Sequence, residues 1–443
     1  MLEQLVRLVS DLELYLFMEV IYDVSVLAQA QRYPKARTGV FRVVDNVARG
    51  LASSPECNLH FCVSESINEP IEFLSRDAQL RDVDLALSNS ARLKLTLYNQ
   101  IHKLTDRVEL APSAMSATMF KTARKGVYSL ANFIGHHGQV LRTKDLAADV
   151  YHSPFHPLPE QTRGQNGMKR FLTVYDLIPT IYPQFFETDL KELFAQILNS
   201  LRPDDFAFCI SECTKHDLCN YRPDLDPARV FVTPLAASEV FFACTDTQRL
   251  SQTRSRYHIP EGAQYFLGLS TLEPRKNIEQ LIKCFARLVK EEALDDLYLV
   301  LVGTHGWNYG GILTTLEKDE FLKQRIIVTG YVPDEDLAPL YSGSLGFIYL
   351  SLYEGFGLPL LEAMQCGAPL ISSNTSAIPE VVGDAGLMFA PSDEDEICHA
   401  MLRLYKDQEL RERMSRRSLE RSRLFTWERT VSETIAGYKA ALG

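Results

Sequence analysis

Short apolar runs alternate with amphipathic stretches along most of the 443-residue chain. This alternation is typical of β-α-β units, in which helices cover parallel strands. We therefore predict an α/β fold. The runs expected to form strands are 20–26, 171–178, 205–211 and 230–235 in the first half, and 265–270, 298–302, 326–328, 346–350 and 369–372 in the second half.

The clearest predicted helix begins after Asn277 and follows the strand at 265–270. Its apolar residues recur every three or four positions and form one stripe, with charged residues on the opposite face. The stripe consists of Ile278, Leu281, Ile282, Phe285, Leu288 and Val289. A further helix is predicted near residue 430, where Trp427, Val431, Ile435 and Tyr438 recur at helical spacing.

Residues 234–262 show no strand pattern and separate two sets of strands, which indicates two sheets. The length also fits two domains, because about 100–200 residues per domain is usual. We predict a first domain over 1–236 and a second domain over 237–424. A closing helix over 425–443 is expected to pack back on the first domain.

Residues 1–20 are apolar but contain Glu3, Asp11, Glu13 and Glu19, so they do not resemble a signal peptide. An unexported, cytoplasmic protein is therefore expected. Apolar residues in this segment recur at helical spacing, which fits either a helix packed on the first domain or a helix at the inner face of the membrane. The acidic residues favour packing over peripheral membrane contact.

The net charge and the cysteines limit the classes of function that the protein can have. The net charge is −11, which argues against a nucleic-acid partner. The nine scattered cysteines fit reduced thiols in the cytoplasm. Cys209, Cys213 and Cys219 lie near His216 but lack the paired spacing of a zinc site, so no metal is expected.

The strongest candidate site follows the predicted strand 346–350, where residues 354–359 read Glu-Gly-Phe-Gly-Leu-Pro. Pro359 fits the first turn of a helix, and Gly355 and Gly357 allow the backbone to approach a ligand closely. The helix start adds a partial positive charge of about half a unit. This arrangement predicts a diphosphate site.

Two acids flank this loop, Glu354 before the helix and Glu362 within it. Carboxylates accept hydrogen bonds from hydroxyl groups, so sugar and ribose hydroxyls are suitable ligands beside a phosphate site. The alternative is that both acids only stabilise the positive end of the helix.

Two cations lie at the same edge of the predicted sheet, because Arg275 and Lys276 come just after the strand 265–270. Ligands of open α/β sheets bind at the carboxyl ends of the strands. Since cations at a helix start oppose the helix dipole, we interpret these two as partners of a diphosphate rather than as solvated surface residues.

Residues 265–391 resemble the C-terminal domain of the retaining GT-B glycosyltransferases, and of their family four in particular. The resemblance rests on Glu-Pro-Arg-Lys-Asn at 273–277, Gly-Tyr-Val-Pro at 330–333, the two acids eight residues apart at 354 and 362, and Ser-x-x-Pro-Glu at 376–380. More weakly, residues 38–42 resemble the glycine loop that follows the first strand in this family, and 151–157 and 174–179 resemble segments of a mannosyltransferase-rich branch. The resemblance implies two Rossmann-like domains whose parallel sheets face each other across a cleft.

The resemblance also implies the role of each residue. Arg275 and Lys276 are expected to bind the donor phosphates, Glu354 the donor sugar, Glu362 the ribose and the Val332 backbone the base. The other donor-binding residues are expected to be Gly39, Ser270, Gly355, Phe356, Gly357 and Leu358, and the catalytic residues of the first domain Tyr175 and Asp176.

Two positions depart from the family pattern. Relatives often have Arg where this chain has Ser270, and His where it has Tyr175. Tyr175 and Asp176 therefore fit either catalytic roles or those of a strand-end aromatic and a turn cap. His152 and His156 fit either an acceptor groove or a structural role.

The function implied is transfer of a sugar from a nucleoside-diphosphate sugar to a saccharide, lipid or protein hydroxyl, with retention. GDP-mannose ranks ahead of a UDP-sugar as the donor. No cofactor or metal is expected, because cations and amides stabilise the leaving diphosphate. One alternative is a non-catalytic protein that binds a nucleotide sugar. A dehydrogenase is a much weaker alternative, because no Gly-x-Gly-x-x-Gly follows an early strand.

Overall fold

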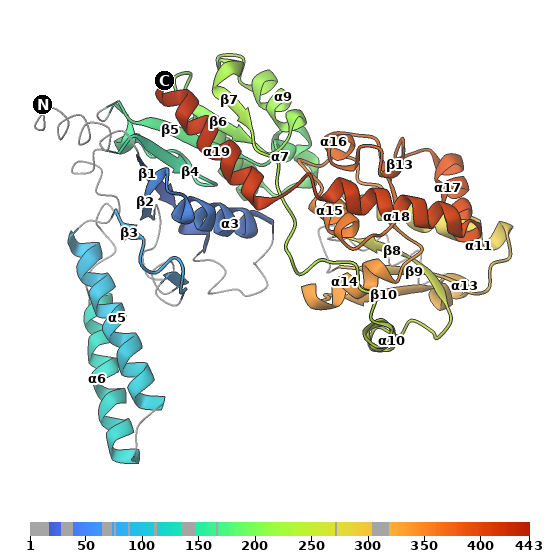
Figure 1. The fold of residues 1–443 in the computed structure, drawn as a ribbon, viewed down its shortest axis with the longest axis horizontal. Coiled ribbons are helices and arrows are strands. Elements are labelled where there is room, and N and C mark those ends of the chain that lie inside the picture. Colours follow the sequence, from blue (N-terminus) through green and yellow to red (C-terminus); the bar gives the residue numbers. More distant parts are fainter. Residues whose placement is uncertain are drawn as a thin grey trace, which may run out of the picture.

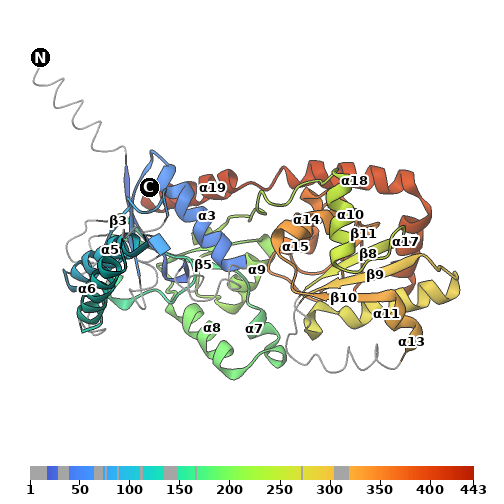
Figure 2. The ribbon, with the colours of Figure 1, turned by 90° about the horizontal axis from the view of Figure 1, so that it is seen from below.

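The computed structural model describes residues 17–27, 39–63, 73–74, 77–86, 89–109, 113–133, 148–164, 167–270, 273–303 and 319–443. Within these residues the strands form two parallel sheets, one of seven strands and one of six. The two sheets and their helices lie next to each other along the longest axis of the molecule (Figures 1 and 2). The N-terminal segment 1–16 and its predicted helix lie outside the described residues.

The first sheet has the strand order β3-β2-β1-β4-β5-β6-β7. The predictions for β1, β5, β6 and β7 are confirmed with shifted ends, whereas β2, β3 and β4 were not predicted. The strands are β1 (Met18–Asp23), β2 (Cys57–Cys62), β3 (Asp84–Leu85), β4 (Val150–Ser153), β5 (Lys169–Val174), β6 (Phe206–Cys209) and β7 (Val230–Val232).

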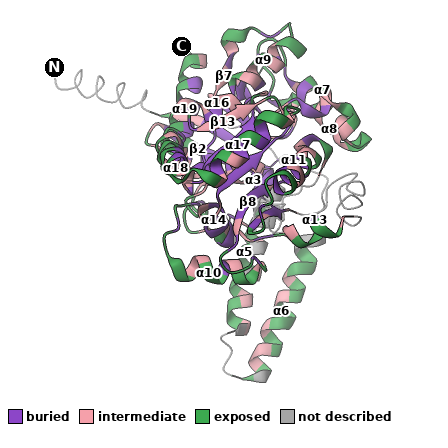
Figure 3. Ribbon diagram, turned by 90° about the vertical axis from the view of Figure 1, so that its right-hand side faces the viewer, coloured by how far each residue is buried: buried purple, intermediate pink, exposed green. Residues whose placement is uncertain are grey.

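The second sheet has the order β10-β9-β8-β11-β12-β13. All five strands predicted in this half are confirmed, and only β13 was not predicted. The strands are β8 (Gln264–Leu269), β9 (Leu297–Val302), β10 (Ile326–Gly330), β11 (Gly346–Tyr349), β12 (Leu370–Ser373) and β13 (Gly386–Phe389). Nearly every residue of β8, β9, β11 and β12 is buried, as expected for parallel strands covered on both faces (Figure 3).

Helices cover both sheets (Figures 1 and 2). The helix predicted after Asn277 is α11 (Ile278–Glu291), and every residue of its predicted apolar stripe is buried. The others are α3 (Gly39–Ser53), α5 (Asn89–Glu109), α6 (Ala114–Phe133), α7 (Ile178–Ile181), α8 (Thr188–Ser200), α9 (Glu212–Tyr221), α10 (Thr247–Arg256), α13 (Glu320–Arg325), α14 (Asp334–Ser342), α15 (Leu358–Gln365), α16 (Ile378–Val382), α17 (Glu394–Lys406), α18 (Gln408–Ser422) and α19 (Trp427–Leu442). None of the described helices is both long and apolar enough to span a bilayer.

Helix α19 runs from the second sheet back to the first, where it packs on α3 and β5 (Figure 1). The ring of its buried Tyr438 packs on Phe171 and Phe208 of the first sheet. The Tyr438 hydroxyl lies 2.5 Å from Nδ1 of His152, whose Nε2 lies 2.8 Å from Oγ1 of Thr173. Burial lowers the pKa of His152 to about 3, so its imidazole is neutral. The structural role considered for His152 is therefore the one observed.

Helices α5 and α6 form an antiparallel hairpin that extends away from the first sheet (Figures 1 and 3). The hairpin connects β3 to β4 and was not predicted. No described residue of either helix is buried. The hairpin therefore adds little to the core.

Two glycines provide a test of this packing. A Cβ at Gly50 of α3 would lie 2.2 Å from Cγ2 of Val431 in α19, whereas a Cβ at Gly126 of α6 would meet nothing within 4 Å. We expect Gly50→Ala to destabilise the protein by about 1–3 kcal/mol, because it forces α19 away from α3. Gly126→Ala should be neutral or stabilising by up to about 1 kcal/mol, since alanine is the better helix former. Thermal melting of both variants checks this, and equal melting temperatures would contradict the close packing.

Candidate functional site

The carboxyl edge of the second sheet carries the predicted glycine loop. Strand β11 ends at Tyr349, and α15 begins at Leu358 with Pro359 in its first turn. Gly357 precedes the helix with a φ of 102°, a left-handed conformation that favours glycine. The predicted order of strand, glycine loop and helix is confirmed.

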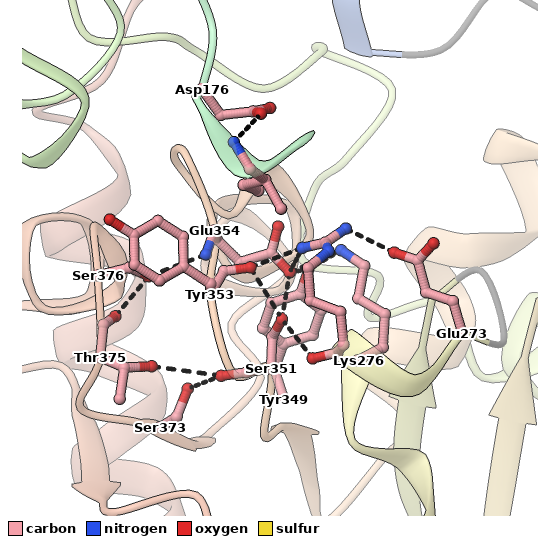
Figure 4. Close-up of polar contacts among 12 residues, drawn as sticks. Asp176, Glu273, Lys276, Tyr349, Ser351, Tyr353, Glu354, Ser373, Thr375 and Ser376 are labelled. Carbon is pink, nitrogen blue, oxygen red and sulfur yellow. Dashed lines mark hydrogen bonds and ion pairs between the residues drawn. The ribbon is translucent and has the colours of Figure 1, made fainter. Parts of the chain in front are cut away.

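Glu354 lies in this loop at the centre of a buried polar cluster (Figure 4). Its Oε1 accepts hydrogen bonds from Lys276 Nζ at 2.6 Å, Tyr349 OH at 2.8 Å and Ser351 Oγ at 2.5 Å. Arg275 Nη1 is 3.0 Å from the same oxygen. Burial alone would raise the pKa of Glu354, but Lys276 and Arg275 hold it at about 2, below its usual value. Glu354 is therefore a carboxylate at neutral pH.

Lys276 and Arg275 belong to a short 3-10 helix, η6 (Pro274–Lys276), that follows β8. Burial lowers the pKa of Lys276, and the nearby Glu354 opposes this change. The Arg275 guanidinium donates to Glu273 Oε1 at 2.5 Å and to the Tyr353 carbonyl at 2.6 Å. Arg275 thus lies behind Glu354, with its Nη1 and Nη2 groups directed at protein atoms.

A second buried acid, Glu362 of α15, pairs with the first half of the chain. Arg42 of α3 places Nη1 2.9 Å from Glu362 Oε1 and also pairs with Asp334 at the start of α14. Burial raises the pKa of Glu362 to about 7, with Arg42 opposing this rise and Asp334 adding to it. This cluster joins the two sheets across the site.

A cavity of about 460 Å³ connects these clusters. Its walls include both acids, Lys276 and the start of α15, together with residues that follow β5 in the first sheet. Twelve of the thirteen predicted site residues line it: Gly39, Tyr175, Asp176, Ser270, Lys276, Val332, Glu354, Gly355, Phe356, Gly357, Leu358 and Glu362. Arg275 does not line it.

Two hydroxyl groups at this cavity are buried without a hydrogen-bond partner among the described residues, Tyr175 OH and Ser270 Oγ. Buried polar groups are normally paired, so an unpaired one beside a cavity indicates a ligand contact. Asp176 also lines the cavity, while its Oδ1 accepts from the Ile178 amide at 2.9 Å. The turn-cap role considered for Asp176 is therefore observed.

The first-sheet side of the site touches the glycine loop directly. A Cβ at Gly355 would lie 2.2 Å from the Tyr175 carbonyl oxygen. Gly355 therefore makes room for Tyr175 in addition to lining the cavity. Its own carbonyl accepts from Ser211 Oγ at 2.7 Å.

A further junction of the two sheets lies at the start of α9. The Glu380 carboxylate of α16 accepts hydrogen bonds from the amides of Glu212 and Cys213, at 2.8 and 2.7 Å. Nearby, Tyr353 OH donates to Asp217 Oδ2 at 2.5 Å. In this structure, these contacts hold the two sheets in their positions relative to each other.

Among the residues that line the cavity, four with polar side chains were missing from the predicted set: Arg42, Tyr331, Asp334 and Tyr349. Arg42 lies three residues after Gly39, inside a segment already singled out for its similarity to the family. The signal in the sequence that could have identified Arg42 was a cation in this segment, with an acidic partner in the other half of the chain. Tyr349 lies within the predicted strand 346–350, and nothing in the sequence distinguishes it from a core residue.

Comparison with known proteins identifies the class. Residues 251–421 match the family described as Glycosyl transferases group 1. The chain is 33% identical over 305 residues to the O-antigen chain mannosyltransferase B of Escherichia coli, covering 68% of this chain and 77% of that protein. It is 30% identical over 279 residues to the serotype-specific mannosyltransferase WbdA of Escherichia coli, of which it spans only 34%.

Among solved structures, the sucrose-phosphate synthase of Thermosynechococcus elongatus aligns with a TM-score of 0.62. The alignment covers 95% of this chain and 98% of that protein at 17% identity, which supports the fold alone. Two Rossmann-like domains of this kind, with a cavity at the carboxyl edge of the second sheet, define a GT-B glycosyltransferase fold. The chain belongs to the group 1 family of glycosyltransferases.

Titration of Glu362 gives a test of the site electrostatics. Its pKa in the folded protein, about 7, lies above its usual value of 4.5. Protonation therefore favours the folded state, and this contribution is complete below pH 4.5 and lost as the pH rises through 7. Relative to Glu362→Gln, the wild-type protein should lose up to about 3 kcal/mol of stability over that range. Melting temperatures of both proteins from pH 4.5 to 8 check this, and a constant difference would contradict the raised pKa.

Proposed function

We propose that this glycosyltransferase moves a mannosyl group from GDP-mannose to a hydroxyl of a saccharide or lipid-linked saccharide, with retention and without a metal ion. A UDP-sugar is the second choice of donor. The observation that carries the proposal is the cavity in which Lys276, Glu354, Glu362 and the start of α15 meet the Tyr175 segment of the other sheet. The mannosyltransferase names of the two Escherichia coli relatives favour mannose.

The donor diphosphate lies, in this proposal, between the start of α15 and Lys276. The amides of the first turn of α15 and its positive dipole end suit phosphate oxygens. Phosphate oxygens would also raise the lowered pKa of Lys276 and keep its amino group charged. Arg275 acts through Glu354, which it positions, since its Nη1 and Nη2 groups already donate to protein atoms.

Glu354 and Glu362 then bind opposite ends of the donor. Glu354, with its pKa held at about 2, accepts hydrogen bonds from the sugar hydroxyls. Glu362 accepts from the ribose hydroxyls, and its pairing with Arg42 links nucleotide binding to the first domain. Tyr175 OH, which has no hydrogen-bond partner among the described residues, donates to the sugar from the opposite wall.

The reaction breaks the bond between the sugar C1 and the diphosphate oxygen and forms one between C1 and the acceptor oxygen on the same face. The acceptor proton passes to the departing diphosphate oxygen. Negative charge grows on this group in the transition state, where Lys276 and the α15 amides stabilise it more than in the ground state.

The two acids make separable predictions. Glu362→Ala should weaken GDP binding about tenfold or more, because it removes the ribose contact. Glu354→Gln should leave GDP binding within about threefold of wild type and lower the transfer rate by about a hundredfold or more. Calorimetry with GDP and transfer assays with GDP-mannose measure both effects, with Glu320→Gln, an exposed acid on α13, as the matched control.

Donor choice is tested by melting the wild-type protein with GDP, UDP and dTDP and with their sugars. A selective nucleotide at about a hundred times its dissociation constant should stabilise the protein by roughly 3 kcal/mol. If UDP alone stabilises the protein, the donor is a UDP-sugar and not GDP-mannose. Binding without transfer or donor hydrolysis would identify a non-catalytic protein instead.

Tyr175 has its own prediction. Tyr175→Phe removes only the hydroxyl, so we expect KM for GDP-mannose to rise about three- to tenfold while the affinity for GDP is unchanged. Tyr175→His, which restores a polar group at this wall, should recover part of the loss. Equal weakening of GDP and GDP-mannose by Tyr175→Phe would place the hydroxyl at the nucleotide instead of the sugar.

A further inference from the structure

The α5–α6 hairpin lies outside the site and is not explained by the proposed function. It extends from the first sheet, and the end of α5 and the start of α6 lie far from that sheet (Figure 1). Half-buried apolar residues hold the helices together along one seam, among them Leu97, Leu104, Phe120 and Val127. The outward faces are exposed to solvent.

The hairpin differs from the rest of the chain in charge. Residues 89–133 contain seven Lys and Arg and two Asp and Glu, a net charge of +5, whereas the whole chain carries −11. All other residues together therefore carry −16. Positive charge is concentrated on this one projecting element.

The cations on the outward side of α6 are available to a partner. Lys121 and Lys125 are exposed and one turn apart, and neither pairs with a carboxylate among the described residues. Arg107 and Arg124, in contrast, contact Phe120 and Thr105 within the hairpin. A cluster of basic residues on an amphipathic helix is typical of binding to anionic lipid.

Helix α6 also exposes apolar side chains, near the end of the hairpin that lies far from the first sheet. Met115 is 85% exposed and Met119 is 62% exposed, and both lie in the first two turns of α6. Large apolar side chains on the same helix as exposed lysines suit a bilayer interface, where they enter the acyl boundary while the amino groups remain at the phosphates.

We infer that the α5–α6 hairpin binds the surface of an anionic lipid bilayer, with Lys121 and Lys125 at the phosphates and Met115 and Met119 in the interface. A second copy of this chain is less favoured, since the exposed apolar residues do not gather into one patch. Leu93 and Leu130 lie at the near end of the hairpin and the two methionines at the far end. The hairpin belongs to the first domain and so brings that domain to the membrane.

The test is co-sedimentation of the full-length protein with vesicles. We expect binding to vesicles of phosphatidylcholine with 30% phosphatidylglycerol, little binding to phosphatidylcholine alone, and release in about 0.5 M NaCl, where charges are screened beyond about 4 Å. Lys121→Glu with Lys125→Glu should weaken binding about tenfold or more. Met115→Ser with Met119→Ser should weaken it about threefold or more, since it removes apolar burial only.

The matched control reverses two exposed charges elsewhere, Arg416→Glu and Arg423→Glu, and so changes the net charge equally. Its binding should equal that of the wild type, and melting curves confirm that each variant is folded. The inference is overturned if the wild-type protein binds neither vesicle type or binds both equally. It is also overturned if the lysine variant binds the anionic vesicles as well as the wild type does. If the wild-type protein instead forms a dimer that the lysine variant loses, as measured by light scattering, the partner is a second copy. GDP binding and transfer to a soluble acceptor should not change in any of these variants, so a failure here is distinct from a failure of the proposed function.

Discussion

The buried carboxylate of Glu354 is the constraint on which the donor site depends. A charged carboxylate away from water is costly unless cations and hydrogen-bond donors surround it. Lys276, Arg275, Tyr349 and Ser351 supply these partners. Because they come from the ends of both β8 and β11, the charge requirement ties two loops of the second sheet into one arrangement.

The loop that presents Glu354 is also one of the contacts between the domains. Gly355 lies against the Tyr175 carbonyl, and the carbonyl of Gly355 accepts from Ser211. The wall contributed by the first domain therefore depends on the position of the glycine loop. Arg42 extends this dependence to the other end of the cavity, where it pairs with Glu362.

Much of the second sheet could be predicted from the sequence, and less of the first. Strands β8, β9 and β11 are apolar at nearly every position, because helices cover both of their faces. In contrast, β2 and β4 contain His60 and His152, whose burial depends on partners distant in sequence. No local pattern indicates such partners. The α5–α6 hairpin was not predicted, because its apolar seam is narrow and most of its exposed residues are polar.

At the site, residue types and order were sufficient to select the residues that line the cavity, because strands of a parallel sheet present their carboxyl ends at one edge. The orientation of each side chain could not be predicted. Arg275 and Lys276 are adjacent in the sequence, yet one faces protein atoms and the other faces the cavity. That difference arises from the 3-10 turn of η6 and from the carbonyl of Tyr353, which is 78 residues away.

The packing of α19 on the first sheet has a consequence for synthesis of the protein. Tyr438 completes the core around His152 and Phe208, although it follows β7 by about two hundred residues. During translation, the first sheet leaves the ribosome with this part of its core uncovered, and the whole second sheet is made before α19 can cover it. Part of the core of the first domain therefore stays open to solvent until synthesis is nearly finished, which is much later than its place in the sequence would suggest.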